Sequence, residues 1–411
     1  MCFGNALEWY EYGIYVYFAP VLSELFFSPA SPLGAIVSFY LVLAIGFLSR
    51  PIGGLLFGSI GDRVGRRAAV VYSIVFMTIP TFLIGLLPTY AQAGWTAPLL
   101  LCILRLCQGI PAGGEFPGTI TYLVESGPPE SRGFMGSWSY FGSQFGIILN
   151  ITEILLLERY LTHDQLATWG WRASFLFGGL IGVMGIFLRV WLKETQFFRV
   201  IEEKAEVEKE PVVWAFKRYK SRMALGFLMA SLPLMGGWMI FGFNPSYFQQ
   251  TFSITLDQNL IISWCMIVLS TFSLPFFGML GDRFNKKPLL IGSTLAVIAL
   301  AYPLYAAAAA GSLPLTLALE AAMTLILSFQ FAMIPGLLAD LFPTSVRFTG
   351  VAMSYNFCNS FLASATPVLS FYLIKTTGIS TIPAAVFILI SLLTLGAFIA
   401  LKEHRGHLRD L

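Results

Sequence analysis

Long apolar runs recur along the whole 411-residue chain, and they constrain its fold more than any other feature. A helix needs about 20 mainly apolar residues to cross the hydrocarbon core of a bilayer. Breaks at charged, polar and Pro/Gly clusters divide the sequence into twelve segments of this kind. The predicted spans are 3–27, 35–59, 68–88, 95–124, 134–157, 171–193, 222–249, 257–280, 288–309, 312–340, 348–375 and 379–401. We therefore expect an all-α membrane protein with twelve transmembrane helices.

The composition agrees with a membrane protein and argues against metal or nucleotide chemistry. The chain is 56% hydrophobic and 11% charged, whereas soluble globular domains are about 25% charged. The five cysteines lack metal-type spacing, and the three histidines, His163, His404 and His407, lie outside the apolar runs. No segment resembles a Walker loop. We expect no metal, no cofactor, no nucleic-acid partner and no enzymatic activity.

One charged stretch divides the chain into two halves. Residues 193–220 mix glutamate and lysine, which predicts a solvated helix or linker. Six predicted spans precede it and six follow it. The expected organisation is an N-terminal bundle at 1–192, a cytoplasmic linker at 193–221 and a C-terminal bundle at 222–411.

The positive charges orient the spans. With the termini in the cytoplasm, most basic residues of the connections lie on the cytoplasmic side, as the positive-inside rule requires. These are Arg63, Arg66, Arg67, Arg132, the basic residues of the linker, Arg283, Lys286, Lys287 and Arg347. The opposite side receives Arg159, Arg172 and Lys375. We predict a multi-pass protein of the cytoplasmic membrane, with both termini cytoplasmic.

Two motifs recur at equivalent places in the two halves. The loop 61-GDRVGRR-67 has its counterpart in 281-GDRFNKK-287, and 129-PESRG-133 has its counterpart in 343-PTSVRFTG-350. Such an internal duplication places a transporter's binding site at the interface of the halves, near the bilayer midplane.

The fourth span carries buried charges on a single face. Arg105, Gln108, Ala112, Glu115 and Thr119 follow helical spacing and form one polar stripe. Arg105 and Glu115 are ten positions apart, about 15 Å along a helix, so they cannot form an ion pair with each other.

Three glutamates are predicted at similar depth in the cytoplasmic half, Glu8, Glu11 and Glu115. Carboxylates close together in a low-dielectric region cannot all stay ionised. We therefore predict that these three glutamates bind and release a proton near neutral pH, which is the chemistry that a proton carrier needs. Arg105 can clamp a substrate carboxylate or neutralise a glutamate. The alternative for Glu8 and Glu115 is that each holds loop backbone or an arginine at the cytoplasmic end. Arg50 is predicted to neutralise a group in this region, with Glu8 as the candidate.

The chain resembles the major facilitator superfamily, and within it the metabolite:proton symporter family of proline/betaine, α-ketoglutarate, citrate and shikimate carriers. The duplicated Gly-Asp-Arg loop and 105-RLCQG-109 resemble the superfamily's signatures. The family resemblance is carried by 4-GNALEWYEYGIY-15, 50-RPIGGLLFGSIGDRVGRR-67, 104-LRLCQGIPAGGEFPG-118, 132-RGFMGSW-138 and 169-WGWR-172. One departure is 8-EWYEY-12, where the family usually has Glu-Trp-Phe-Asp-Phe.

The resemblance implies two pseudo-symmetric six-helix bundles and contacts between their loops that stabilise the outward-facing state. Asp62 and Asp282 lie next to the starts of the third and ninth spans, where a helix N-terminus favours an anion. The basic residues of these loops can bridge to acids or carbonyls of the other half. The predicted gating residues are Asp62, Arg63, Arg66, Arg67, Arg132, Asp282, Arg283 and Arg347.

The remaining predicted substrate-binding residues are polar or aromatic. In the seventh span, Trp238, Phe241 and Asn244 share a face, and Pro245 predicts a broken helix. The full set is Arg105, Gln108, Tyr12, Tyr15, Trp238, Asn244, Gln330, Asn356 and Asn359. Trp9 with Tyr12, Tyr15 and Trp238 can form a cation–π wall for an ammonium group, although an aromatic stripe of this kind can also be plain packing.

These observations favour secondary active transport. We expect a monomeric carrier that imports a small carboxylate-bearing metabolite, an organic acid or a zwitterion such as proline or betaine, with H⁺ by alternating access. The proton gradient is the expected energy source, and membrane lipid is the expected surrounding. The alternatives are uniport or exchange without proton coupling, and a non-transporting membrane sensor. A sensor needs a signalling domain, and neither the termini nor the linker is long enough for one.

Overall fold

The computed structural model describes residues 1–27 and 32–401, and all regular secondary structure in these residues is helical. Eleven helical segments are long and apolar enough to cross a membrane. The first predicted span adds a twelfth, because α1 (Cys2–Tyr17) and α2 (Ala19–Phe26) follow each other across Phe18. The twelve predicted spans are therefore confirmed. His404, His407 and the last ten residues of the predicted C-terminal half, 402–411, lie outside the described residues.

The N-terminal six-helix bundle contains the first six spans. After α1 and α2 its membrane helices are α3 (Pro32–Leu48), α4 (Arg50–Arg63), α5 (Arg66–Gly85), α7 (Thr96–Ser126), α8 (Arg132–Tyr160) and α10 (Trp171–Val190). Short elements connect them: α6 (Tyr90–Ala93), η1 (Pro129–Ser131), α9 (His163–Gln165) and η2 (Leu166–Gly170).

The C-terminal bundle contains the other six spans. Its elements are α13 (Lys220–Trp238), η3 (Met239–Phe243), α14 (Asn244–Phe252), α15 (Leu256–Arg283), α16 (Lys286–Ala309), α17 (Leu313–Asp340), η4 (Thr344–Val346), α18 (Arg347–Phe357), η5 (Cys358–Ala363), α19 (Ala365–Thr377) and α20 (Ile382–Ala400). Two helices lie in the linker, α11 (Gln196–Glu203) and α12 (Pro211–Arg218).

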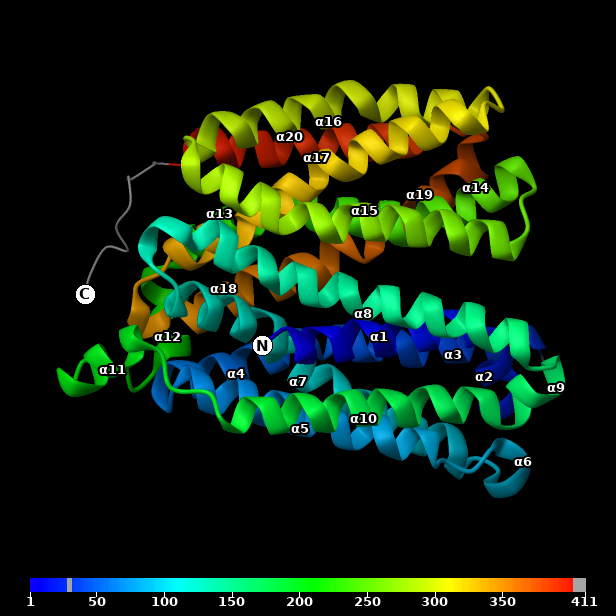
Figure 1. The fold of residues 1–411 in the computed structure, drawn as a ribbon, viewed down its shortest axis with the longest axis horizontal. Coiled ribbons are helices and arrows are strands. Elements are labelled where there is room, and N and C mark those ends of the chain that lie inside the picture. Colours follow the sequence, from blue (N-terminus) through cyan, green and yellow to red (C-terminus); the bar gives the residue numbers. More distant parts are fainter. Residues whose placement is uncertain (28–31, 402–411) are drawn as a thin grey trace.

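The two bundles lie side by side with their helices nearly parallel (Figure 1). One end of the molecule carries α11 and α12, and we call it the linker end. The opposite end, which we call the far end, carries α6, α9 and α14 (Figure 1). Between the bundles, α8 packs along α15, and α4 packs against α18.

Close packing of α7 against α3 and α4 brings charged residues of different helices together. Glycines on α7 allow this approach, because a Cβ at Gly109 would overlap the Gly46 carbonyl and one at Gly113 would overlap the Arg50 carbonyl. Small residues four apart let membrane helices approach each other in this way. Arg50 of α4 is thereby placed beside the polar face of α7.

Candidate functional site

A cavity of about 240 Å³ lies between the two bundles. It is lined by α1 and α8 from the N-terminal half, and by span 7, α15, α17 and span 11 from the C-terminal half. None of the side chains that line it is charged. Eight of them are aromatic: Trp9, Tyr12, Tyr17, Tyr140, Trp238, Phe241, Phe331 and Tyr355. Its polar lining includes Ser143, Gln144, Asn259, Ser263 and Asn359.

Trp238 organises one wall of this cavity. Its indole Nε1 donates a hydrogen bond to Oδ1 of Asn359 at 2.9 Å. Its ring packs edge-on against Tyr12 with centroids 5.4 Å apart, and against Trp9 at 6.4 Å. Trp238 directly precedes η3, and Asn359 lies within η5; both segments have π-helical geometry. Such irregular turns inside membrane helices are frequent at functional sites.

An aromatic layer closes the cavity towards the linker end. Phe116 stacks on Tyr355 with centroids 4.5 Å apart, and Tyr140 packs on Phe331 at 4.7 Å. These residues lie a few turns from the linker-end termini of their helices, whereas Tyr17 and other lining residues lie near the far end. The cavity therefore occupies the part of the interface nearer the far end.

A buried charge cluster lies inside the N-terminal bundle, beside the cavity. Arg50 donates to Glu8 Oε1 at 2.6 Å, so the predicted partner of Arg50 is confirmed. Arg105 donates to Gln108 Oε1 at 3.0 Å, and Gln108 donates to Glu11 Oε2 at 3.1 Å. All five side chains are at least nine-tenths buried. We call these five residues the charge cluster.

The charge cluster surrounds a small void of about 20 Å³, which is enough for about one water molecule. In this part of the described structure, four cluster atoms are buried without a hydrogen-bond partner: Glu8 Oε2, Glu11 Oε1, Arg50 Nε and Arg105 Nε. Two carboxylates face two guanidinium groups, so the cluster is charge-balanced only while both acids are ionised. Tyr12 lines both this void and the main cavity.

Arg105 and Tyr15 face each other within the bundle and do not line the main cavity. The Arg105 guanidinium carbon lies 3.9 Å from the centroid of the Tyr15 ring. Both side chains are buried. In this conformation Tyr12 stands nearer to the cavity than either of them, since it alone of the three lines it.

Glu115 lies apart from the charge cluster, in an ion pair with Arg189 of α10. Arg189 Nη1 donates to Glu115 Oε2 at 2.7 Å, and the Ser73 hydroxyl donates to the same oxygen at 2.6 Å. This arrangement corresponds to the alternative in which Glu115 holds an arginine. Arg189 was not predicted as a partner, although it is an arginine inside the predicted span 171–193, whereas Arg172 lies at the edge of that span.

The predicted neutral ligands are dispersed. Asn359 lines the cavity. Asn356 donates to the Gly113 carbonyl at 2.6 Å and so links the halves. Gln330 donates to hydroxyls of α16, and Asn244 donates to Glu320 at 2.9 Å, both inside the C-terminal bundle. These three side chains are fully buried and do not line the cavity.

The duplicated loops connect the two halves at the linker end. Asp62 accepts hydrogen bonds from the backbone amides of Phe348 at 3.1 Å and Thr349 at 2.9 Å. Asp282 accepts from those of Gly133 and Phe134, both at 2.8 Å. The expectation that these acids stabilise the N-termini of spans 3 and 9 is therefore wrong. Each one binds the N-terminal turn of a helix in the opposite half, α18 or α8, because α4 and α15, whose last turns carry these acids, pack against those two helices.

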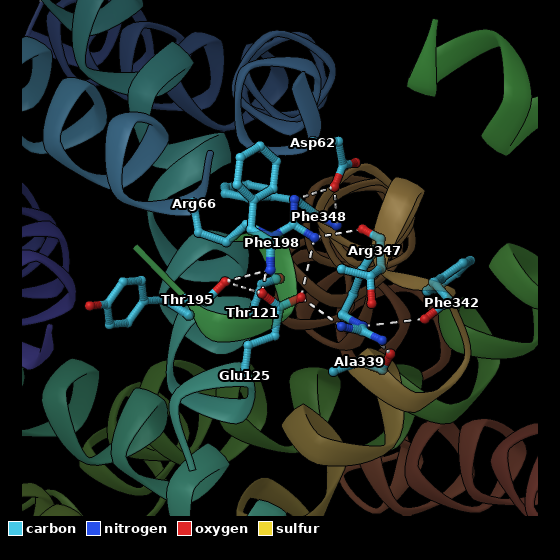
Figure 2. A network of polar contacts seen from close by, with 12 residues as sticks. Asp62, Arg66, Thr121, Glu125, Thr195, Phe198, Ala339, Phe342, Arg347 and Phe348 are labelled. Atoms are coloured by element: carbon cyan, nitrogen blue, oxygen red, sulfur yellow. Dashed lines mark hydrogen bonds and ion pairs between the residues drawn. The ribbon is translucent and has the colours of Figure 1, made fainter. Parts of the chain in front are cut away.

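Glu125 connects the loop 61–67, which contains Asp62 and Arg66, to the C-terminal half (Figure 2). It accepts from Arg66 Nε at 3.1 Å and from Arg347 Nη1 at 2.6 Å. Arg66 also donates to Asp62 at 2.9 Å and to the Thr344 carbonyl at 2.6 Å. We call Asp62, Arg66, Glu125, Thr344 and Arg347 the Asp62 network. Glu125 was missed in the sequence, although it is an acid four residues before Pro129 of the repeated Pro-x-Ser motif.

The contacts around the second duplicated loop, 281–287, are more exposed than those around 61–67. Arg132 donates to Asp340 at 2.8 Å across the interface, and Lys286 lies 3.2 Å from Asp282. We call these four residues the Asp282 network. Among the other predicted gating residues, Arg67 donates to the Val190 carbonyl at 2.7 Å within its own half, and Arg63 and Arg283 are exposed.

Comparison with known proteins gives one consistent family. Residues 1–215 match the family described as Sugar (and other) transporter. The chain is 31% identical to the proline/betaine transporter of Salmonella typhimurium, over 97% of this chain and 82% of that protein. It is 30% identical to the glycine betaine/proline/ectoine/pipecolic acid transporter OusA of Dickeya dadantii, over 97% and 81%.

Solved structures agree with the fold. The proton:xylose symporter XylE bound to 6-bromo-6-deoxy-D-glucose superposes with a TM-score of 0.76 at 17% identity, over 96% of this chain and 92% of that one. XylE from E. coli in an inward open conformation gives 0.66 at 18% identity, over 98% of both chains. The chain therefore belongs to the major facilitator superfamily, in its metabolite:proton symporter family, and is a multi-pass membrane transporter and not an enzyme.

Proposed function

We propose that the chain is a secondary active transporter that imports a small zwitterion of the proline or betaine type together with H⁺. The observation that carries this proposal is the position of Tyr12. It lies between an aromatic cavity without charged side chains and a cluster of two glutamates and two arginines.

The cavity favours a zwitterion over an organic acid. Eight aromatic rings suit an ammonium group, which they attract through cation–π interactions. A dianionic or trianionic acid would lose its hydration without gaining a cation from the lining, which is costly. A zwitterion loses the hydration of a single carboxylate, and its ammonium group gains contacts with the aromatic rings. The names of the relatives, which transport proline, betaine and ectoine, support the same substrate class.

The charge cluster is the proposed site of proton coupling, with Glu11 and Glu8 as the acids. A proton on Glu11 would weaken its bond to Gln108 and leave the arginines in excess. The resulting positive potential behind Tyr12 would favour a substrate carboxylate in the cavity, so proton and substrate would bind together. Glu115 is not included, because it lies outside the charge cluster and its void, in a separate ion pair with Arg189.

The proposed transport cycle rocks the halves 1–192 and 222–411 against each other, with 193–221 as the connecting linker. The basic loops at the linker end support a cytoplasmic location for that end and for both termini. With the Asp62 and Asp282 networks formed, the cavity is closed towards the cytoplasm. We propose that these networks stabilise the outward-facing state, that the carrier works as a monomer in the bacterial inner membrane without a cofactor, and that the proton gradient drives it.

Uptake into proteoliposomes tests this function. With an alkaline interior, labelled betaine or proline should accumulate above its external concentration, and an uncoupler should abolish the accumulation. Glu11→Gln should lose accumulation but keep exchange of internal for external substrate. Equal uptake with and without the gradient would point to a uniporter. The absence of both uptake and exchange in the wild type would favour the sensor alternative.

A further inference from the structure

Glu320 is a buried acid on α17 that the proposed transport cycle does not use. Its side chain is 2% exposed. Oε1 accepts a hydrogen bond from the Asn244 amide at 2.9 Å. Seven ion pairs occur among the described residues, and none of them includes Glu320.

Asn244 connects Glu320 to two further helices. It is the first residue of α14, directly after η3. Its Oδ1 accepts a hydrogen bond from the hydroxyl of Tyr305 on α16 at 2.8 Å. The hydrogen-bonded series Glu320–Asn244–Tyr305 thus holds the C-terminal third of span 7 against α16 and α17.

Among the described residues, no ion pair or cation contact reaches this hydrogen-bonded series. From α14, Tyr247 packs on Tyr305 at 5.9 Å and donates its own hydroxyl to the Ser380 carbonyl. From η3, Phe243 packs on Tyr305 at 6.4 Å, and from α20, Phe387 packs on it at 6.3 Å. Tyr247 and Tyr305 are therefore the titratable neighbours in this part of the described structure, and both act as hydrogen-bond donors.

Burial of an unpaired carboxylate among such neighbours is costly, and an acid in this position takes up a proton instead. Asn244 is also adjacent to the wall of the main cavity, which Phe241, Gly242, Pro245 and Ser246 line. A change at Glu320 therefore acts on a segment that faces the bound substrate.

We propose that Glu320 is a second proton-binding site, in the C-terminal half, and that its protonation allows the η3–α14 segment of span 7 to stay packed against α16 and α17 without a buried charge. Loss of this proton leaves a bare carboxylate in a neutral pocket. Its desolvation cost outweighs the stronger hydrogen bond that the ionised carboxylate accepts from Asn244, so the ionised form favours a conformation in which the segment moves away from α17 and water reaches Glu320. This goes beyond the proposed coupling at Glu8 and Glu11, and it concerns the opposite wall of the cavity.

Hydrogen–deuterium exchange of the purified full-length protein tests this proposal without substrate or gradient. Residues 239–252 of the wild type should exchange slowly at acidic pH, and about tenfold faster at alkaline pH after correction for intrinsic rates, the effect expected from loss of about one hydrogen bond. Glu320→Gln cannot ionise but retains an oxygen for Asn244, so protection in this variant should not depend on pH.

Glu153→Gln is the matched control. It makes the same change at a half-buried glutamate on α8, hydrogen-bonded to Tyr10, and it should keep the wild-type pH dependence at residues 239–252. If Glu320→Gln also keeps that dependence, the proposal is overturned.

A second variant carries the test if Glu320→Gln does not fold. Glu320→Asp can still ionise, but its carboxyl is withdrawn by one methylene from Asn244. Protection of residues 239–252 at acidic pH should therefore fall below the wild-type level. Full wild-type protection in this variant would show that the contact does not hold the segment, and would overturn the proposal. Because transport is not measured, failure here leaves the proposed function untouched.

Discussion

Arg347 of α18 donates a hydrogen bond to Glu125 of α7 at 2.6 Å, and both side chains are fully buried between the two halves. Arg66 donates to the same carboxylate, so a single acid binds two arginines from different halves, while Asp62 supplies the second negative charge. This relationship makes Glu125 the residue on which closure of the linker end depends most.

Glu125→Gln should open the linker end. The substitution leaves Asp62 as the remaining acid of the network for two buried guanidinium groups, and loss of one partner of a buried ion pair costs about 3–5 kcal/mol. A cysteine at Thr344, in a background without other reactive cysteines, should be alkylated much faster in this variant. Glu130→Gln, at an exposed glutamate of the same end, should leave the rate unchanged; equal rates in both variants would contradict the prediction.

Asp62→Asn should destabilise the protein more than Asp282→Asn. An asparagine oxygen can replace one of the two bonds to backbone amides, but it lacks the charge that favours a helix N-terminus. Asp62 also binds the buried Arg66, whereas the partner of Asp282 is the half-exposed Lys286. Thermal unfolding in detergent measures the difference. A larger loss for Asp282→Asn would refute this ranking.

Glu115→Gln and Arg189→Met should each lower stability, and the double variant should recover much of the loss. Removal of one partner leaves an unpaired buried charge, while removal of both leaves none. The thermal midpoints of the four proteins form the double-mutant cycle. The double variant should also retain gradient-driven uptake, since Glu115 is not a proposed proton carrier. If a well-folded double variant lost gradient-driven uptake, Glu115 would have to be counted among the proton carriers.

Trp238→Leu should weaken binding of a quaternary ammonium substrate. The change removes an aromatic face from the cavity and leaves Asn359 without its indole donor. A desolvated cation–π contact contributes about 2 kcal/mol, so the Kd for betaine should rise by roughly 10- to 30-fold. Val213→Leu, at an exposed position of α12 in the linker, serves as the control. An unchanged Kd for Trp238→Leu would remove Trp238 from the binding wall.

The sequence was sufficient for the span count, the two halves and the Arg50–Glu8 pair. The length of the apolar runs determines how many helices cross a bilayer. An arginine buried in the membrane needs an acid at similar depth, and for Arg50 the acid Glu8 met this condition. The pairing of Glu115 with Arg189 depends on how α7 and α10 pack, which run length does not encode.

Helix rotation explains most of the remaining differences. A polar residue such as Gln330 or Asn356 needs a partner inside the membrane, but its sequence position does not say whether it faces the cavity or its own bundle. The π-helical turns η3 and η5 add an extra residue to a turn and shift the facing of the residues around them. Asn244, directly after η3, is turned into the C-terminal bundle for this reason.

The two networks at the linker end differ in their contact with water, and this difference sets an order of events. Asp62, Arg66, Glu125 and Arg347 are inaccessible, whereas Asp340 and Lys286 are partly exposed. Water and salt screen exposed ion pairs and weaken them. Separation of the halves should therefore be sequential. The contacts of the Asp282 network, at α8 and α17, should break first, while the Asp62 network still holds α4 against α18. Added salt should speed the first step far more than the second.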